Sequence, residues 1–230
     1  MSIFIAALDL GQLQDYSALV VIEARGTSRM VTMDALDDET GMRITRQVPV
    51  EMMPLAQVDV RYAERFPLKT KYAVIAQMMR HRLGKMPRPR YFAFDKTGVG
   101  VGVSEMFEQF APIGVTFVAG NTTSAVGPQD YHVPKRDLIA SAQVLLQNGV
   151  MRIAKEIAQA ETLVKELLAF RMKISLGGHD TYEAWREKDH DDLVNALAIA
   201  CWVASLIVSV DAANKLSGTQ RQDPPIISPY

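Results

Sequence analysis

The apolar and polar positions divide the chain into short strand-like runs, mostly in the first half, and longer helical periods, mostly in the second. Apolar runs of strand length predict strands at residues 3–8, 17–24, 29–36, 90–94 and 115–118. A polar turn between the first two predicts a hairpin that opens a sheet. Apolar residues at helical spacing predict helices at residues 69–83, 103–110, 135–147, 158–170 and 191–208.

Three further segments give weaker patterns. Residues 40–67 hold three prolines and mixed polarity, so they predict no particular element. Residues 120–132 are polar without a period and are interpreted as a loop. Residues 172–184 carry Gly177-Gly178 between strand-like residues, which predicts a β-hairpin. The order of elements predicts an α/β fold, a mixed β-sheet flanked by helices.

Composition indicates one domain over residues 1–210, followed by a polar, proline-bearing tail over 211–230 that we expect to be flexible. The single cysteine, Cys201, lies in an apolar helical run, as expected of a buried thiol in a reducing compartment. The start of the chain lacks the basic segment of a signal peptide, and Asn195 and two serines interrupt the longest apolar run. We therefore expect a cytoplasmic protein without a membrane partner.

Carboxylates occur where three predicted elements begin or end. Asp9 follows the first strand and Asp95 the strand at 90–94, each with glycine close behind, while Asp191 and Asp192 open the last helix. Each has an ordinary structural explanation: Asp9 as a turn residue, the Asp191/Asp192 pair as helix N-terminal caps. The glycine-rich segment after Asp95 lacks the lysine and serine of a Walker A phosphate loop.

The combination of these carboxylates suggests metal chemistry. Two carboxylates about 4 Å apart repel by roughly 4 kcal/mol at an effective dielectric constant near 20, so a convergent set needs a cation. Oxygen ligands favour Mg²⁺ or Mn²⁺. Two such ions, about 3.5–4 Å apart, would activate water and stabilise the leaving oxygen in phosphodiester hydrolysis. We hypothesise that Asp9, Asp95, Asp191 and Asp192 form this site, with His190 and Asn195 beside them as accessory residues.

A chain-long resemblance supports this hypothesis. ALDLGQLQDYSALVVI, FDKTGVGVGVSEMF, PKRDLIASAQVLLQNGVMRI and HDDLVNALAIACW resemble, in order and spacing, the nuclease domain of bacteriophage terminase large subunits. The resemblance implies a ribonuclease H-like fold related to RuvC resolvases, and metal-dependent endonucleolytic cutting of concatemeric viral DNA during genome packaging. It maps the metal ligands to Asp9, Asp95 and one of the last pair, with Asp192 as the direct ligand and Asp191 assisting.

The sequence departs from the family pattern in two respects. Asn195 stands where the family usually has a further acid, which leaves the second metal ion open. No Walker motif occurs, so the chain is an excised or separately encoded nuclease domain and does not itself drive translocation. Asp15 resembles an accessory acidic position, or forms an Asx turn. The resemblance implies as partners a terminase ATPase domain or subunit, the small terminase subunit and the portal, in the cytoplasm of a bacterial host.

Contact with double-stranded DNA must come from local basic clusters, because the net charge is −1. The candidates are an acid-free basic stretch, the start of the helix at 135–147 and the predicted hairpin after residue 171. They comprise Arg80, Arg82, Lys85, Arg88, Lys135, Arg136 and Lys173. The first stretch is also consistent with solvated surface charge. Since no base-reading motif occurs, we expect backbone contacts and weak sequence preference.

Two other functions are consistent with the sequence. A Holliday-junction resolvase of RuvC type would use the same carboxylates but prefer four-way junctions. A non-catalytic ribonuclease H-like module would dock an ATPase or portal partner and would not bind Mn²⁺. Sugar kinases and actin-like ATPases share the DLG pattern, but they need two such domains and this chain is too short for both.

Overall fold

A computed structural model of the chain describes residues 2–11, 15–26, 30–36, 43–49, 55–176 and 191–217. Its main sheet has eight strands in the order β10-β5-β2-β1-β6-β7-β9-β8. These strands are β1 (Ser2–Asp9), β2 (Ala18–Gly26), β5 (Leu55–Arg65), β6 (Arg90–Asp95), β7 (Ile113–Val118), β8 (Ser124–Ala125), β9 (Asp130–Pro134) and β10 (Met151–Ile153). A separate two-stranded sheet pairs β3 (Met30–Leu36) with β4 (Arg43–Pro49).

Strand directions determine which ends share an edge of the sheet. β2 runs antiparallel to both of its neighbours, β1 and β5, while β6 is parallel to β1 and β7 is parallel to β6. The strands β1, β5, β6 and β7 therefore all end at the same edge. In parallel sheets, sites form in such places, outside the carboxyl ends of strands.

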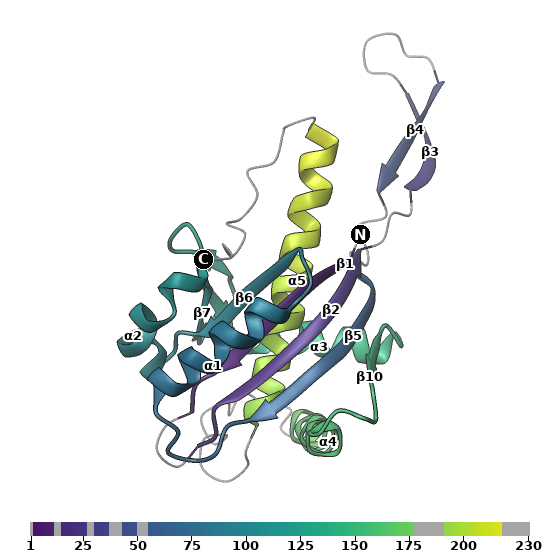
Figure 1. Ribbon diagram of the computed structural model, residues 1–230. Helices are drawn as coiled ribbons and strands as arrows, with labels where there is room; N and C mark the ends of the chain where they lie inside the picture. The colour runs from purple at the N-terminus through teal and green to yellow at the C-terminus, as the bar shows by residue number, and fades with distance from the viewer. Residues whose placement is uncertain are drawn as a thin grey trace.

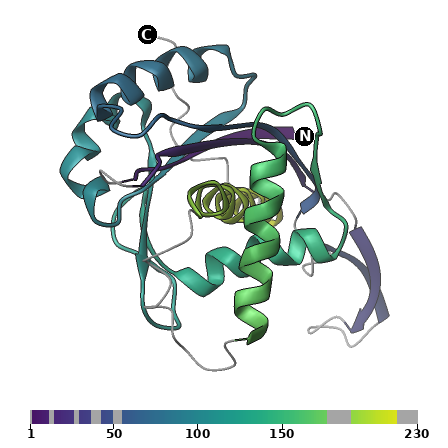
Figure 2. The same cartoon turned by 90° about the horizontal axis from the view of Figure 1, so that it is seen from below.

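Helices cover both faces of the sheet. They are α1 (Tyr72–Lys85), α2 (Val99–Val103), α3 (Lys135–Gln147), α4 (Ala160–Leu176) and α5 (Asp192–Ser217), with two short 3₁₀ turns at Ser104–Met106 and Glu108–Phe110. α5 lies against one face with α3 and α4 beyond it, while α1 and α2 lie on the other face (Figures 1 and 2). The mixed sheet flanked by helices confirms the predicted fold class.

The alternation of side chains along the strands builds a core on each face. Ile5, Val20 and Ile22 point to the α5 side, and their neighbours Leu8 and Leu19 point to the α1 side. Four phenylalanines dominate the α1-side core, with ring centroids 5.5–6.5 Å apart: Phe92, Phe94, Phe107 and Phe110. Both cores hold the ends of β1 and β6 rigidly in place.

α5 is apolar on nearly all sides because it is enclosed by the sheet, α3 and α4. Its first 18 residues, Asp192–Ser209, are long and apolar enough to cross a bilayer by composition, with a mean hydropathy of 1.8. However, 67% of that stretch is buried inside the fold, as in the core helix of a globular domain. Cys201 lies fully buried in this helix, as predicted.

Several predicted elements differ from the structure. The strand expected at 29–36 exists as β3, but it pairs only with β4 among the described residues, and β5 is the sheet's third strand. The helix expected at 103–110 is two 3₁₀ turns, and α2 precedes them across the glycine-rich segment. A Cβ on Gly100 would lie 2.1 Å from the backbone oxygen of Asp95, so only glycine lets α2 approach this strand end.

Three other boundaries also moved. The polar stretch 120–132 contains β8 and the start of β9, an edge region where few side chains need to be apolar. Residues 172–176 are the last turn of α4 rather than the start of a hairpin, and the rest of that predicted hairpin lies outside the described residues. α5 continues beyond the predicted end at 208 to Ser217, and the tail over 218–230 lies outside the described residues.

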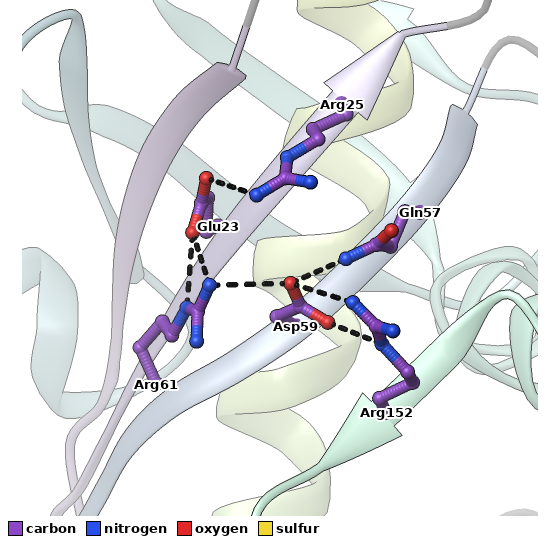
Figure 3. Close-up of polar contacts among 6 residues, drawn as sticks. All are labelled: Glu23, Arg25, Gln57, Asp59, Arg61 and Arg152. Carbon is purple, nitrogen blue, oxygen red and sulfur yellow. Dashed lines mark hydrogen bonds and ion pairs between the residues drawn. The ribbon is translucent and has the colours of Figure 1, made fainter.

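The α1-side face of β2 and β5 carries a charged network where α1 does not cover it (Figure 3). Glu23 and Asp59 are buried there, and both accept from Arg61, at 2.6 and 3.3 Å respectively. Arg25 and Gln57 add bonds from the same two strands, and Arg152 of β10 donates to Asp59 at 2.7 Å. Ion pairs therefore cover the part of this sheet face on which α1 does not lie.

Candidate active site

Two buried carboxylates lie side by side at the shared edge of the sheet. Leu8 of β1 is paired with Phe94 of β6 in parallel register, so Asp9 and Asp95 follow at the same level of adjacent strands. Their exposed fractions are 7% and 9%. A turn residue on the surface would be more exposed, so the turn interpretation of Asp9 does not explain its position.

The N-terminus of α5 brings the second acidic pair to this edge. Asp192, the first residue of α5, is 6% exposed, and Asp191 precedes it. The side-chain nitrogen Nδ2 of Asn195 donates to Asp9 Oδ2 at 3.2 Å and to Asp191 Oδ1 at 3.3 Å. Asn195 therefore ties the start of α5 to the end of β1 and links two of the four carboxylates.

The electrostatics show that these groups interact. Burial raises the pKa of Asp9 well above its ordinary value, and the charges of Asp95 and Asp192 raise it further. The hydrogen bond from Asn195 lowers the pKa of Asp9, and the charge of Asp191 raises it. This carboxylate is thus surrounded by three others in a place that water reaches poorly, which favours its neutral form unless positive charge is added.

The pKa of Asp95 is also raised, again because its charged form is buried. Burial raises its pKa to about 6, while hydrogen bonds from Thr97 and the charge of Lys135 act in the opposite direction. The Thr97 backbone N–H donates to Asp95 Oδ1 at 2.7 Å. That bond fixes the orientation of the carboxylate at the start of the glycine-rich segment.

Two cations border the cluster, one on each side. Lys135, at the start of α3, lies with Nζ 3.6 Å from Asp191 Oδ2. Arg65, the last residue of β5, lies 3.6 Å from Asp192 Oδ2 and 2.6 Å from Glu166 Oε1. Positive charge therefore reaches the two acids of α5, while Asp9, between them, carries the largest accumulated repulsion.

Sequence reasoning missed Arg65 and Glu166. Glu166 of α4 accepts the backbone N–H of Val194 at 3.3 Å, so it caps the first turn of α5. Burial raises its pKa to about 7 against the opposing charge of Arg65. No local signal identified either residue: Arg65 falls in the stretch without a predicted element, and Glu166 lies within an unremarkable helical period.

The donor set fits a hard divalent cation, because every candidate ligand offers oxygen and the cluster has an excess of negative charge. Within the ranges that the structure describes, no three His, Cys, Asp or Glu side chains are gathered closely enough to enclose an ion. Asp9, Asp95 and Asp192 are thus electrostatically coupled neighbours, and their sharing of an ion stays a prediction. His190 lies outside the described residues.

The basic residues predicted to contact DNA are distributed over several places. α1 connects the end of β5 to the start of β6, so it begins near the carboxylates, and Lys85 and Arg88 lie at the opposite end of the sheet. Arg80 donates to Gln109, and Arg82 pairs with Glu64 and stacks on Tyr62. The structure thus pairs Arg82 with residues at the end of β5, next to Arg65, and places Lys85 and Arg88 near the start of β6.

The other predicted DNA contacts lie on α3 and α4. Lys135 borders the carboxylates, whereas Arg136 is exposed and pairs with Asp137 at 3.3 Å. Lys173 lies in the last part of α4, where only the backbone is described. Asp15 is exposed in the turn between β1 and β2 and lines a pocket with Gly11 and Ser17. DNA contact by Lys135, Arg136 and Lys173 stays a prediction, as does the accessory role of Asp15.

Comparisons with known proteins agree with this architecture. No protein-family model matches the sequence, and no curated protein matches it by sequence. Among solved structures, the fold is similar to the human cytomegalovirus terminase nuclease domain, which was soaked with Mn and bound to an inhibitor. The TM-score is 0.50 at 11% identity, over 90% of this chain and 85% of that one. The chain therefore has the ribonuclease H-like fold of a terminase nuclease.

Proposed function

We propose that this protein is a metal-dependent endodeoxyribonuclease that hydrolyses phosphodiester bonds in double-stranded DNA. One observation carries the proposal: Asp9 is buried among Asp95, Asp191 and Asp192 at the carboxyl edge of a terminase-nuclease fold. Arg65 and Lys135 pair with Asp192 and Asp191, yet Asp95, Asp191 and Asp192 still raise the pKa of Asp9. Such repulsion at a buried carboxylate is what a cation-binding catalytic site would relieve.

Asp9, Asp95 and Asp192 would hold Mg²⁺ or Mn²⁺, with Asp191 assisting. When bound, such cations supply the positive charge that activates water and stabilises the leaving oxygen. The raised pKa of Asp9 supports this assignment, because a cation would relieve the repulsion from its neighbours. Two ions are proposed, with Asn195 in place of a carboxylate weakening the second.

The chain's own polar groups would orient the ligands. Asn195 donates to one oxygen of Asp9 and one of Asp191, and Thr97 N–H donates to one oxygen of Asp95. Each carboxylate is thereby held in a fixed orientation while retaining a second oxygen. Such supporting bonds fix the geometry of metal ligands in other proteins. Asn195 is thus a positioning residue that adds no charge.

Lys135 and Arg65 would act on the DNA as well as on the acids. Each lies 3.6 Å from an acid of the α5 start, and the two stand on opposite sides of the site. Cations beside a carboxylate cluster lower the repulsion that an incoming phosphate would meet. We infer that the substrate backbone crosses the carboxyl edge of the sheet between α3 and the end of β5.

The proposed biological setting is suggested by the likeness of the fold to a terminase nuclease domain. A terminase-nuclease fold supports a nuclease role in DNA packaging, and we propose cutting of concatemeric bacteriophage DNA in the bacterial cytoplasm. The ATPase motor, the small terminase subunit and the portal are the proposed partners. Some basic residues, among them Lys85 and Arg88, lie away from the carboxylates. They would contact only DNA that extends well beyond the site, or these partners.

Plasmid cleavage tests the proposal. With Mn²⁺ or Mg²⁺, the purified chain should nick and linearise supercoiled DNA, and EDTA should stop it. Asp95→Asn should remove this activity, whereas Asp59→Asn, which removes an equally buried carboxylate of the same sheet, should retain it. Cutting by Asp95→Asn would disprove the site. A strong preference for four-way junctions would indicate a resolvase, and a folded chain that does not bind Mn²⁺ would indicate a non-catalytic module.

A further inference from the structure

A pocket of about 300 Å³ opens beside the carboxylate cluster. Its walls come from two loops that converge at the carboxyl edge of the sheet, the turn from β1 to β2 and the connection from β5 to α1. The lining residues are Gly11, Asp15, Ser17, Pro67, Lys69, Thr70, Lys71 and Tyr72. Lys69 and Lys71 are exposed side chains, so this wall of the pocket carries two mobile positive charges.

The pocket is firmly attached to the strand that carries Asp9. The hydroxyl of Tyr72 donates to the backbone oxygen of Gly11 at 2.9 Å, and Gly11 N–H donates to Ser17 Oγ at 3.2 Å. Phe66 N–H donates to the Ser17 backbone oxygen at 2.8 Å. A Cβ on Gly11 would lie 2.4 Å from the oxygens of Asp15 and Tyr16, so only glycine permits this closure. The two loops therefore form one unit with the end of β1.

The distance from the pocket to the reacting site matches DNA. Gly11 is two residues past Asp9, so their Cα atoms lie at most about 7.6 Å apart. The rise of about 3.4 Å per nucleotide is measured along the duplex axis, and successive phosphates of one strand lie farther apart than that, so a phosphate that reaches the pocket lies close to the one that is cut. A strand whose phosphate is cut at Asp9 would bring a neighbouring phosphate to Lys69 and Lys71.

We propose that this pocket binds a backbone phosphate of the DNA strand close to the bond that is cut. The proposal rests on the proposed nuclease function and specifies how its substrate is held. Lysine ammonium groups neutralise phosphate as point charges, and α1 begins here without an acidic residue in its first turn. The contact is independent of base identity, as expected for a positioning contact.

Asp15 limits the affinity of the pocket. It is the acidic residue of the lining, so the net charge of the wall is +1, from two lysines and one aspartate. A carboxylate beside a phosphate repels it and shortens the stay of the bound strand. Asp15→Asn should therefore tighten DNA binding, which is opposite to the effect expected if Asp15 were an accessory metal ligand.

Salt-dependent binding tests the pocket. Anisotropy of a labelled 30-base-pair duplex is measured in EDTA, which prevents cutting, from 50 to 200 mM salt. Each lost phosphate contact reduces the slope of log K against log salt by about 0.9. The double variant Lys69→Gln/Lys71→Gln should lose about 1–2 in slope. Lys155→Gln, which neutralises an exposed lysine in the loop between β10 and α4, should leave the slope unchanged.

Kinetics provide a second readout. In Mn²⁺, the double variant should raise KM for the duplex several-fold with kcat within about twofold, because the pocket binds ground and transition states equally. A neutral methylphosphonate, placed in turn at each phosphate near the cut, should weaken wild-type binding at one position and have no effect there on the double variant. Comparing the wild type and the double variant, each with normal and with methylphosphonate DNA, identifies the phosphate that the pocket holds.

The outcomes separate the two proposals. If the wild type cuts DNA but the double variant retains its slope and KM, the pocket assignment is wrong and the nuclease function stands. An equal loss of salt slope in Lys155→Gln would also overturn the pocket assignment, because the loss would then reflect the total charge of the protein. If the wild type neither binds nor cuts duplex DNA with any metal, the nuclease function itself fails.

Discussion

The sheet buries two sets of carboxylates whose surroundings differ in sign. Glu23 and Asp59 lie in a network with three arginines, and the hydrogen bonds from Arg61 lower the pKa of Glu23. Asp9 lies among three other acids, and burial and repulsion raise its pKa. Glu23 and Asp59 in the first set, and Asp9, Asp95 and Asp192 in the second, are all below 10% exposed. Burial therefore does not distinguish the two sets; the charges that act on Glu23 and Asp9 do.

The balance of charge also decides what each region can do. The Glu23 and Asp59 network closes an open sheet face, and its ion pairs, with arginines about half exposed, contribute modest stability. The acids around Asp9 repel one another, which reduces the stability of the fold and would favour the binding of a cation. Such local conflicts are expected at functional sites.

The largest expected difference between the two regions is in catalysis. Asp9→Asn should lower the rate of plasmid cutting by a factor on the order of 10³, since it removes a charge that stabilises the transition state through the metal. Asp59→Asn should change the rate by less than about threefold. Single-turnover rates in Mn²⁺ measure both, and comparable losses would erase the distinction between the regions.

Metal binding should stabilise the fold only through the acidic cluster. Mn²⁺ at 100 times its Kd should raise the free energy of unfolding by about 2.7 kcal/mol. The shift should disappear in Asp9→Asn and persist in Asp59→Asn. Urea unfolding with and without Mn²⁺ gives the values, and a full shift in Asp9→Asn would place the ion elsewhere.

The pH dependence of stability should also have opposite signs in the two regions. The folded pKa of Asp95 is raised from 3.8 to about 6, so the folded state holds the extra proton between these values. Without metal, this group lowers the free energy of unfolding by on the order of 2 kcal/mol as pH rises from about 4 to 6. Asp95→Asn should remove that decline.

Glu23 provides the opposite case. Its folded pKa lies below 4.5, so the stability that it contributes is present above pH 4.5 and is lost as pH falls through the folded value. Glu23→Gln should therefore reduce stability at pH 7 and make less difference in acid. Denaturation curves from pH 3 to 7 for both variants check the signs, and parallel curves would contradict the account.

The smallest effect should come from restoring the family's acid at position 195. Asn195→Asp replaces a donor to Asp9 and Asp191 by a further negative charge. We expect a loss of about 1 kcal/mol of stability without metal and a Mn²⁺ requirement lowered by less than tenfold. Calorimetric titration counts the ions, and Asn195→Ala, which removes the donor without adding charge, is the matched control.

Much of the site could be predicted because its ligands adjoin strong local patterns. β1 and α5 are unmistakable apolar segments, so Asp9 and Asp192 stand at their ends in the sequence itself. β5 was missed although Val58 and Val60 alternate with Asp59 and Arg61, which is the period of a half-buried strand. Its pairing with β2 joins residues far apart in the sequence and is not visible locally.

The partners of the site could not be predicted for the same reason. Arg65 meets Glu166 across 101 residues, and Asn195 meets Asp9 across 186. The sequence identified Asn195 as a departure from a family pattern, but only the fold shows it as a bridge between two carboxylates. The basic stretch from Arg80 to Arg88 is prominent in sequence, yet only the fold shows that Arg82 pairs with Glu64 and that Arg88 lies beside the start of β6.

The most direct test of the central claim is a crystal structure of the chain with Mn²⁺, located by its anomalous scattering. The account predicts an ion between Asp9 and Asp95 with oxygen ligands, within reach of Asp192, and a weaker second ion beside Asp191. A folded protein that binds Mn²⁺ only elsewhere, or not at all at saturating concentration, would contradict it.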